Sequence, residues 1–200
     1  ENKDIVGVFG QVLPYQPEKN KGKFCPCTFN KNKKEIIDFF CFHWHRIGFG
    51  NNMAFLNKIF NKIGGFKEWL GPGSLGSNAE DGEFSLRLLI KGYKILTTPK
   101  IKIYHNRWEE KNDFLNLLLS YYCGEVACYG YFFFKKNIKI AKEVIKNNFL
   151  DSWKKLKSDF KSFLFFKPKN IKLFFFHLKE LWFRLRGLII AFYYANKNNY

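Results

Sequence analysis

An adjacent pair of acids, Glu80 and Asp81, is the strongest candidate for chemistry in this chain. The pair follows a glycine-rich segment, residues 71–77, and precedes an apolar stretch with helical spacing. The spacing predicts a helix over residues 81–91 with the carboxylates at its first turn, where unbonded backbone N–H groups and the helix dipole favour a charged acid by about 0.3–1 kcal/mol. An ionised Asp81 could accept a proton as a general base. The alternative is that the acid only caps the helix.

The elements around this pair predict an α/β domain. Residues 4–13 read as a first strand, and residues 14–34 as a polar surface loop. The other expected elements are a strand or short helix at 36–44, a strand at 49–55, a helix at 56–63 that ends at Gly64 and Gly65, and extended pieces at 93–97 and 101–105 on either side of Pro99. Alternation of helices and strands of this length is typical of α/β folds.

The character of the chain changes near residue 110, so we predict one domain over residues 1–110 and a mostly helical, basic tail over residues 111–200. The tail contains an apolar stretch at 114–134, an amphipathic lysine-rich helix pattern at 138–166 and a second apolar stretch at 171–194. Glu125 interrupts the first apolar stretch and two arginines interrupt the second, so neither is a clean transmembrane span. We expect helices that lie flat on an anionic membrane surface, or a helical cap packed on protein.

Several short motifs follow one another in a fixed order over residues 4–110. They are Gly48-Phe49-Gly50-Asn51-Asn52-Met53-Ala54-Phe55, Ile63-Gly64-Gly65-Phe66-Lys67-Glu68-Trp69-Leu70-Gly71, the Glu80-Asp81 pair, Arg87, Gly92-Tyr93-Lys94-Ile95, Pro99 and Ile101-Lys102-Ile103-Tyr104-His105. This succession resembles the second half of the catalytic domain of the family 2 glycosyltransferases, which has the GT-A fold. The fold class implied is a truncated GT-A-like mixed sheet with helices, followed by the helical tail.

The resemblance implies an inverting transfer of sugar from a nucleotide-sugar donor to a glycan or lipid-linked acceptor, as in the synthesis of a cell-surface polysaccharide. Asp81 would be the general base and Glu80 would support it. The family uses a divalent metal, Mn²⁺ or Mg²⁺, and His105 resembles the histidine that helps to hold the metal or the diphosphate. A solvated strand-end histidine is the alternative. Arg87 is expected to be a structural partner of an acidic neighbour.

Further residues are expected to bind the substrates. Glycine and asparagine bring backbone and amide groups close to a sugar, and aromatic faces suit sugar rings. The substrate-binding candidates are Gly50, Asn51, Asn52, Trp69, Gly71, Gly73, Arg107 and Trp108. Trp69 has the alternative of being part of the core.

The chain opens on a strand pattern at residue 4 and contains no Asp-x-Asp sequence, the metal motif of the resembled family. We therefore expect a fragment that lacks the nucleotide-binding half and is inactive alone, since half of a parallel sheet would expose an apolar edge. The alternative function is a non-catalytic membrane-surface or partner-binding module derived from such an enzyme.

The net charge of +17 is concentrated in the tail, with +6 over residues 1–110 and +11 over residues 111–200. Of the 34 basic residues 29 are lysines, scattered without the arginine and aromatic clusters of a nucleic-acid surface, so no nucleic-acid partner is expected. We expect a cytoplasmic protein that is peripheral at the inner face of the plasma membrane.

The five cysteines show no paired spacing, which favours a reducing compartment. A zinc site is one interpretation of the cysteines and histidines between residues 25 and 45. The other is ordinary packing, with Cys41, His43 and His45 on one face of a strand. The members of this cluster are Cys25, Cys27, Cys41, His43 and His45.

Overall fold

A computed structural model describes residues 4–163 and 168–197 of the 200-residue chain. The chain forms two compact units, and each is described by itself. The first unit comprises Glu1–Lys67 and Glu80–Asn116, and the second comprises Glu68–Ala79 and Leu117–Tyr200. The acidic pair therefore lies in the first unit, whereas the glycine-rich segment before it lies in the second.

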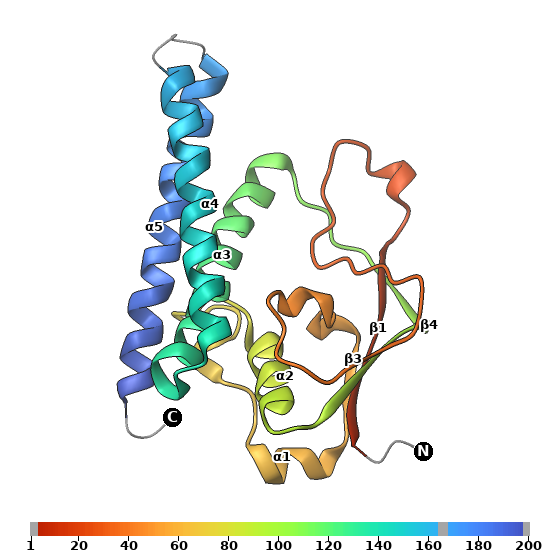
Figure 1. Ribbon diagram of the computed structural model, residues 1–200. Helices are drawn as coiled ribbons and strands as arrows, with labels where there is room; N and C mark the ends of the chain where they lie inside the picture. The colour runs from red at the N-terminus through yellow and green to blue at the C-terminus, as the bar shows by residue number, and fades with distance from the viewer. Residues whose placement is uncertain (1–3, 164–167, 198–200) are drawn as a thin grey trace. The chain divides into compact units, whose positions relative to one another are not determined.

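A four-stranded mixed sheet organises the first unit (Figure 1). Its strands are β1 (Ile5–Pro14), β2 (Glu35–Ile37), β3 (Met53–Phe55) and β4 (Lys94–His105), in the order β2-β4-β1-β3. The two long strands β1 and β4 run parallel, and the two short strands pair antiparallel with them. The α/β class and the first strand predicted from the sequence are thus confirmed.

The extended pieces expected on either side of Pro99 are one strand, β4. Its parallel register with β1 shifts between the pairs Phe9–Thr97 and Gln11–Lys102, so β4 has several residues opposite Gly10 alone. Proline has no N–H to donate to a ladder and is tolerated at such an irregularity. The irregularity therefore lets one strand pass through Pro99 without ending.

Two helices of the first unit were anticipated from local signals. Helix α1 (Asn57–Ile63) ends at Gly64, whose φ of 79° is a left-handed conformation that glycine adopts without steric cost. Helix α2 (Glu80–Ile90) is buried along nearly its whole length. Its Phe84 packs against the rings of Phe55 and Phe60, with centroids 4.8 Å and 5.1 Å away. This aromatic cluster attaches both helices to the short strand β3.

The structure corrects the interpretation of residues 36–55. Of the strand or short helix expected over residues 36–44, only β2 forms as a strand. The prediction that Cys41, His43 and His45 share one face of a strand is wrong, because Trp44–Arg46 forms a 3₁₀ turn. Trp44 is buried and lies where a Cβ on Gly82 would be only 2.5 Å from its ring. Packing of Trp44 against α2 thus overrides the local alternation. The remaining short turns of this unit are 3₁₀ helices at Pro17–Lys19 and Gly50–Asn52, so that of residues 49–55 only β3 is strand.

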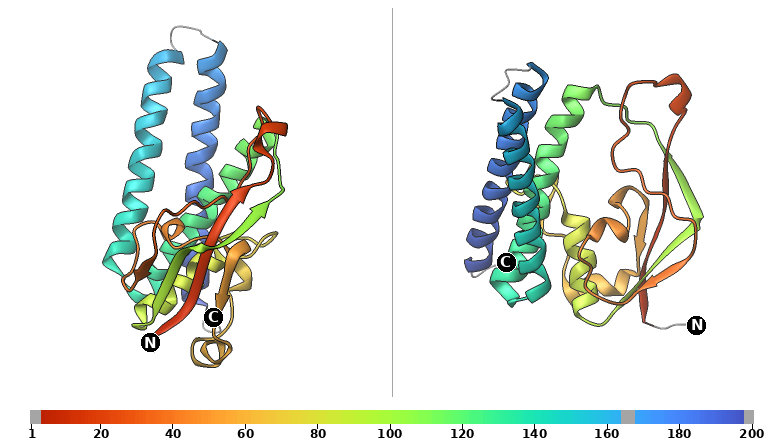
Figure 2. Two further views of the ribbon diagram at one scale, coloured as in Figure 1. Left: turned by 90° about the vertical axis from the view of Figure 1, so that its right-hand side faces the viewer. Right: turned by 45° about the horizontal axis from the view of Figure 1, so that its top comes forward.

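Three long helices build most of the second unit: α3 (Lys111–Lys136), α4 (Lys139–Phe163) and α5 (Pro168–Asn196). Helix α3 begins in the first unit and continues into the second. Helices α4 and α5 lie side by side in both views of Figure 2. The helical nature of the C-terminal part is confirmed, and no helix in the described ranges is long and apolar enough to cross a membrane.

Close packing between helices in the second unit depends on small residues. A Cβ on Gly187 of α5 would lie 2.3 Å from the backbone oxygen of Cys123 in α3. Gly130 of α3 faces Ala191 of α5 in the same way, at 2.6 Å. Such distances leave no room for a side chain, so α3 and α5 approach each other at backbone contact.

Candidate functional site

Asp81 joins two segments of the first unit that are far apart in sequence. Its Oδ2 accepts a hydrogen bond from the backbone N–H of Gly50, at 2.6 Å, and its Oδ1 accepts one from the N–H of Gly82, at 2.7 Å. The carboxylate thus lies between the first turn of α2 and the 3₁₀ helix Gly50–Asn52. The structure brings together Gly50 and Asp81, two residues that the sequence analysis selected independently.

Burial changes the electrostatics of this carboxylate from what the sequence predicted. Asp81 is only 8% exposed, and its burial raises the pKa, while the N–H groups of Gly82 and Gly50 lower it. The net effect is a raised pKa. The backbone donors at the helix start lower the pKa, as predicted, but desolvation outweighs them and the net pKa is raised.

The backbone of Gly50 lies close to this carboxylate. A Cβ there would lie 3.0 Å from Asp81 Oδ2. The two asparagines that follow are bonded to neighbouring backbone: Asn52 Nδ2 donates to the carbonyl of Gln11 at 2.7 Å, and Asn51 Nδ2 to that of Cys27 at 3.4 Å. Asn51 is exposed. Its side chain is therefore the more accessible of the two to a ligand.

Glu80 is the first residue of α2 and is partly exposed. It is adjacent in sequence to Asp81 and on the same first turn, as predicted. A supporting role for Glu80 stays a prediction.

Arg87 has the structural role that the sequence suggested. Its guanidinium forms an ion pair with Glu83, one turn earlier on α2, at 2.9 Å, and Glu83 is completely buried. The same guanidinium donates to the carbonyls of Ile63 and Gly65, the latter at 2.7 Å. Arg87 therefore holds the turn after α1 against α2, and Glu83, which the sequence analysis did not select, neutralises it.

His105 lies at the end of β4 and faces backbone. Its Nδ1 is 3.0 Å from the carbonyl of Pro26 and 3.9 Å from Cys25 Sγ. Within the described ranges no group of three or more His, Cys, Asp or Glu side chains is placed to hold a metal ion. A metal-binding role for His105 and a zinc site in the cluster of residues 25–45 stay predictions.

The two residues after His105 that were expected near the donor differ in their surroundings. Arg107 is exposed and pairs with Glu109 at 2.6 Å. Trp108 is partly buried, and its ring N–H has no hydrogen-bond partner in the structure. That ring nitrogen is itself buried from solvent, and the expectation for Trp108 as a binding residue stays a prediction.

Three of the substrate-binding candidates, Trp69, Gly71 and Gly73, belong to the second unit. Trp69 is buried and stacks on Tyr194 of α5, with ring centroids 4.4 Å apart. Gly71 and Gly73 follow in the same segment, and Gly73 has a φ of 81°. Trp69 is thus a core residue of the second unit, which was the alternative stated for it.

The second unit contains a buried polar cluster that the sequence analysis missed. Arg184 of α5 donates to Ser152 Oγ of α4 at 2.8 Å and pairs with Glu180, one turn earlier, at 3.2 Å. Its Nη1 also lies 3.7 Å from Glu125 of α3. Glu125 and Arg184 were noticed only as interruptions of apolar stretches. A charged residue of each sign inside two apolar helices was the signal that could have identified the pair.

Comparison of the chain with models of known protein families, with curated proteins and with solved structures returned no match.

Proposed function

We propose that this chain carries the acceptor side of a glycosyltransferase, which moves a sugar from a nucleotide-sugar donor to a glycan or lipid-linked acceptor with inversion, with Asp81 as the general base. The proposal starts from the resemblance of the motif order to the family 2 glycosyltransferases. The observation that carries it furthest is the buried Asp81 carboxylate, fixed by the Gly50 and Gly82 N–H groups. This contact joins two of the motifs on which the resemblance rests.

The hydrogen bonds of Asp81 suit a base that must be held still. Oδ2 accepts the N–H of Gly50 and Oδ1 that of Gly82. A carboxylate has about four lone-pair sites, so Asp81 could also accept the proton of an acceptor hydroxyl. The hydroxyl oxygen then bonds to the anomeric carbon as the bond to the nucleoside diphosphate breaks on the opposite face, and the anomeric configuration inverts. The proton ends on Asp81.

The raised pKa favours this chemistry. A general base works best when its pKa is near the working pH, and burial moves the pKa of Asp81 upward from an ordinary aspartate value. A helix-capping acid at the surface would have no such shift. A role of Mn²⁺ or Mg²⁺ at the leaving diphosphate is part of the resemblance, and the proposal assigns no described residue to a complete metal site.

A transfer assay on the native protein tests the proposal. The protein, with every segment that its reading frame encodes, is incubated with a panel of nucleotide sugars and glycan or lipid-linked acceptors, and acceptor-dependent release of nucleoside diphosphate is measured. Asp81→Asn is compared with Asp38→Asn, the same chemical change at an exposed aspartate of the same unit.

We expect transfer with an inverted anomeric product that Asp81→Asn abolishes and Asp38→Asn retains. Equal turnover of the two variants would remove Asp81 as the base. A product with the configuration of the donor would contradict a single inverting displacement.

A further inference from the structure

The outward side of α5 carries an uninterrupted apolar stripe. Its members are spaced alternately by three and four residues, which places them on one helix face over about 25 Å. All six side chains are exposed, by 41–59%. They are Phe175, Leu178, Trp182, Leu185, Ile189 and Phe192.

Helix α4 extends this apolar surface toward α5. Trp153 and Phe160 are 48% and 50% exposed, and they line an open groove of about 550 Å³ with Phe174 of α5. A second groove, of about 450 Å³, adjoins it at Trp153 and reaches Leu181 of α5. The exposed stripe of α5 and these two grooves together are called the α4–α5 surface below.

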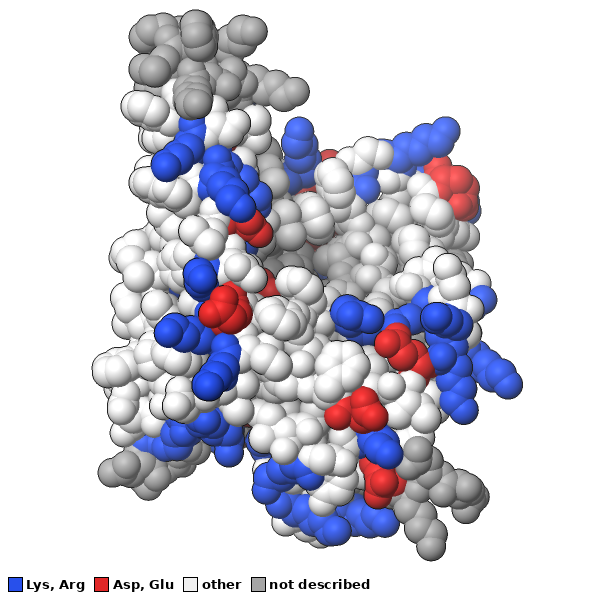
Figure 3. Space-filling model, in the orientation of Figure 1, with Lys and Arg blue, Asp and Glu red and all other residues white. Residues whose placement is uncertain are grey.

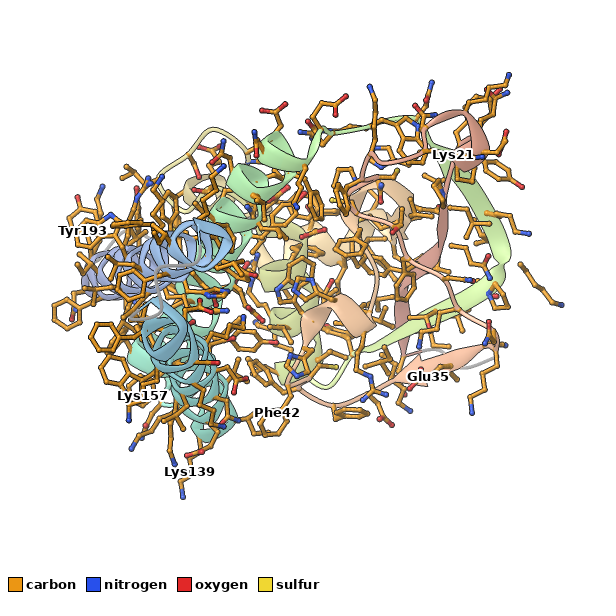
Figure 4. The ribbon with its side chains drawn as sticks, turned by 90° about the horizontal axis from the view of Figure 1, so that it is seen from above. Lys21, Glu35, Phe42, Lys139, Lys157 and Tyr193 are labelled. Atoms are coloured by element: carbon orange, nitrogen blue, oxygen red, sulfur yellow. The ribbon has the colours of Figure 1, made fainter. Side chains whose placement is uncertain are left out.

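Basic side chains border the α4–α5 surface. On α5, Lys172 and Lys179 are exposed and lie about a quarter-turn from the stripe. On α4, the Lys157 ammonium lies 5.3 Å from the centre of the Trp153 ring. Figure 3 shows blue lysine and arginine side chains in a broken column with white side chains beside it, and Figure 4 shows Lys157 and Tyr193 at the outside of their helices. The sole acid in the α5 sequence is Glu180, and it is fully buried.

This distribution of charge argues against a second copy of the chain as the occupant. A stripe with this spacing could form a coiled coil, in which the flanking residues of two helices face each other. The flank of the stripe that carries charge is basic throughout, at Lys172, Lys179 and Arg186. Two antiparallel copies would therefore bring like charges together, and no acid on either flank could offset them.

We propose that the α4–α5 surface docks flat on an anionic lipid bilayer. Phenylalanine, leucine and tryptophan side chains would enter the boundary between headgroups and acyl chains, and the lysines would remain beside the lipid phosphates. The negative charge of the headgroups would pair with the basic flank of the stripe, whereas a second copy would present another basic flank. This inference goes beyond the proposed function and does not depend on it.

Vesicle cosedimentation tests the proposal on the full chain. The probes are vesicles of phosphatidylcholine alone and vesicles in which about a third of the lipid is phosphatidylglycerol, at low and high salt. We expect binding to the anionic vesicles that added salt weakens, and little binding to the neutral ones. Equal binding to both vesicles, or none to either, would overturn the proposal.

Paired variants locate the binding surface. Trp182→Ser combined with Ile189→Ser should lower partitioning at least about tenfold. The matched control is Phe39→Ser combined with Phe42→Ser, two exposed aromatics of the first unit that should leave partitioning within about twofold. A control that weakens binding as much as the test variant would contradict the assignment.

A second pair of variants tests the lysines, again by binding to anionic vesicles. Both variants lose three positive charges, so they have the same net charge. The test variant changes Lys157, Lys172 and Lys179 to Gln, and the control changes the exposed Lys58, Lys62 and Lys100 of the first unit to Gln. The test variant should bind anionic vesicles at least about tenfold more weakly than the control. Equal weakening would show that only total charge matters and would overturn the docking surface.

Two further readouts separate lipid docking from self-association. Vesicle lipids with brominated acyl chains should quench tryptophan fluorescence in the native protein, and Trp153→Phe combined with Trp182→Phe should remove that quenching. Sedimentation without lipid should show a monomer. A dimer that Trp182→Ser dissociates, together with no quenching by the brominated lipid, would identify a second copy as the occupant instead.

Discussion

Each unit of this protein contains a buried Glu–Arg pair one helical turn apart, and the two pairs hold different kinds of structure together. On α2, Glu83 pairs with Arg87. The guanidinium of Arg87 also donates hydrogen bonds to the backbone carbonyls of Ile63 and Gly65, at the end of α1 and in the turn after it. On α5, Glu180 pairs with Arg184, which reaches side chains of α3 and α4 instead. The same local motif therefore fixes a loop in one unit and the register of three helices in the other.

The difference follows from what surrounds each arginine. A loop offers carbonyl oxygens that no ladder uses, and a guanidinium can satisfy two of them at once. Helices have already paired their backbone groups, so an arginine between them must find side-chain acceptors such as Ser152 and Glu125. We infer that the pair on α2 supports the candidate site, which lies on the same helix, and that the pair on α5 stabilises helix packing alone.

The largest expected effect is on the helical cluster. Arg184→Met leaves the carboxylates of Glu180 and Glu125 buried without their main counter-charge, which should lower the free energy of unfolding by about 3–5 kcal/mol. Arg46→Met is the matched control, because Arg46 is exposed in its ion pair with the half-buried Glu35, and that pair should be worth at most about 1 kcal/mol. Urea denaturation measures the free energy of unfolding of both variants. Equal losses would show that the buried pair on α5 contributes no more to stability than a pair at the surface.

A smaller loss is expected where α3 and α5 meet. Gly187→Ala places a methyl group against the Cys123 carbonyl oxygen, part of a helix backbone that cannot move aside locally, and should cost about 1–3 kcal/mol. Gly65→Ala is the control, since a Cβ there meets no atom within 4 Å. Thermal unfolding of the two variants checks this. A Gly187→Ala variant as stable as Gly65→Ala would mean that the helices do not approach at this point.

Arg87→Lys tests the pair on α2, whose arginine binds backbone carbonyls. Lysine keeps a charge near Glu83 but cannot reach the carbonyls of Ile63 and Gly65 with a rigid fork, so about 1–2 kcal/mol should be lost. Hydrogen exchange should quicken in the turn at residues 63–66 and remain unchanged in α5. Faster exchange throughout the chain would contradict a local role for Arg87.

The smallest effect is a difference in pH dependence between two buried acids. Burial outweighs the backbone donors and raises the pKa of Asp81. The contribution of Asp81 to stability is therefore present below the ordinary aspartate pKa and is lost as pH rises through the raised value. Burial also raises the pKa of Glu180, but the bond from Ser152 and the charges of Arg184 and Lys155 outweigh it, and the net pKa is lowered. The contribution of Glu180 is therefore present above the ordinary glutamate pKa and is lost as pH falls through the lowered value.

Two amide variants check these signs. Relative to the native protein, Asp81→Asn should become more stable as pH rises through the acid range, and Glu180→Gln should become less stable. Denaturation at a series of pH values measures both differences. Parallel curves for the two variants would show that the two carboxyls have the same environment.

Local signals in the sequence predicted much of the first unit. Strand β1, helix α1 with its end at Gly64, and helix α2 were all anticipated, because alternation, helical spacing and a left-handed glycine are properties of neighbouring residues. The Trp44 turn was not anticipated, and for Trp69 the sequence left substrate binding and the core both open. Each residue is fixed by a partner far along the chain, Gly82 and Tyr194 respectively. Tertiary packing of this kind leaves no periodicity to read.

The candidate site shows the same division. The sequence placed Asp81 on the first turn of a helix, and helix-start chemistry alone predicted the charged form. The sign of its pKa shift depends on burial, which the sequence did not reveal. Glu83 was missed because it looked like one more acid beside Glu80 and Asp81, whereas its full burial against Arg87 appears only in the fold.

The pH–rate profile of sugar transfer tests the central claim, that Asp81 is the general base, most directly. The native protein should show kcat/KM rising with pH to a plateau as Asp81 loses its proton at a pKa above the ordinary aspartate value. Asp81→Asn should lower kcat by about 10²–10⁴-fold, or about 3–5 kcal/mol of barrier, and should lose that rise. Near-normal turnover by Asp81→Asn at saturating acceptor, with the rise intact, would contradict the claim and leave Glu80 as the next candidate.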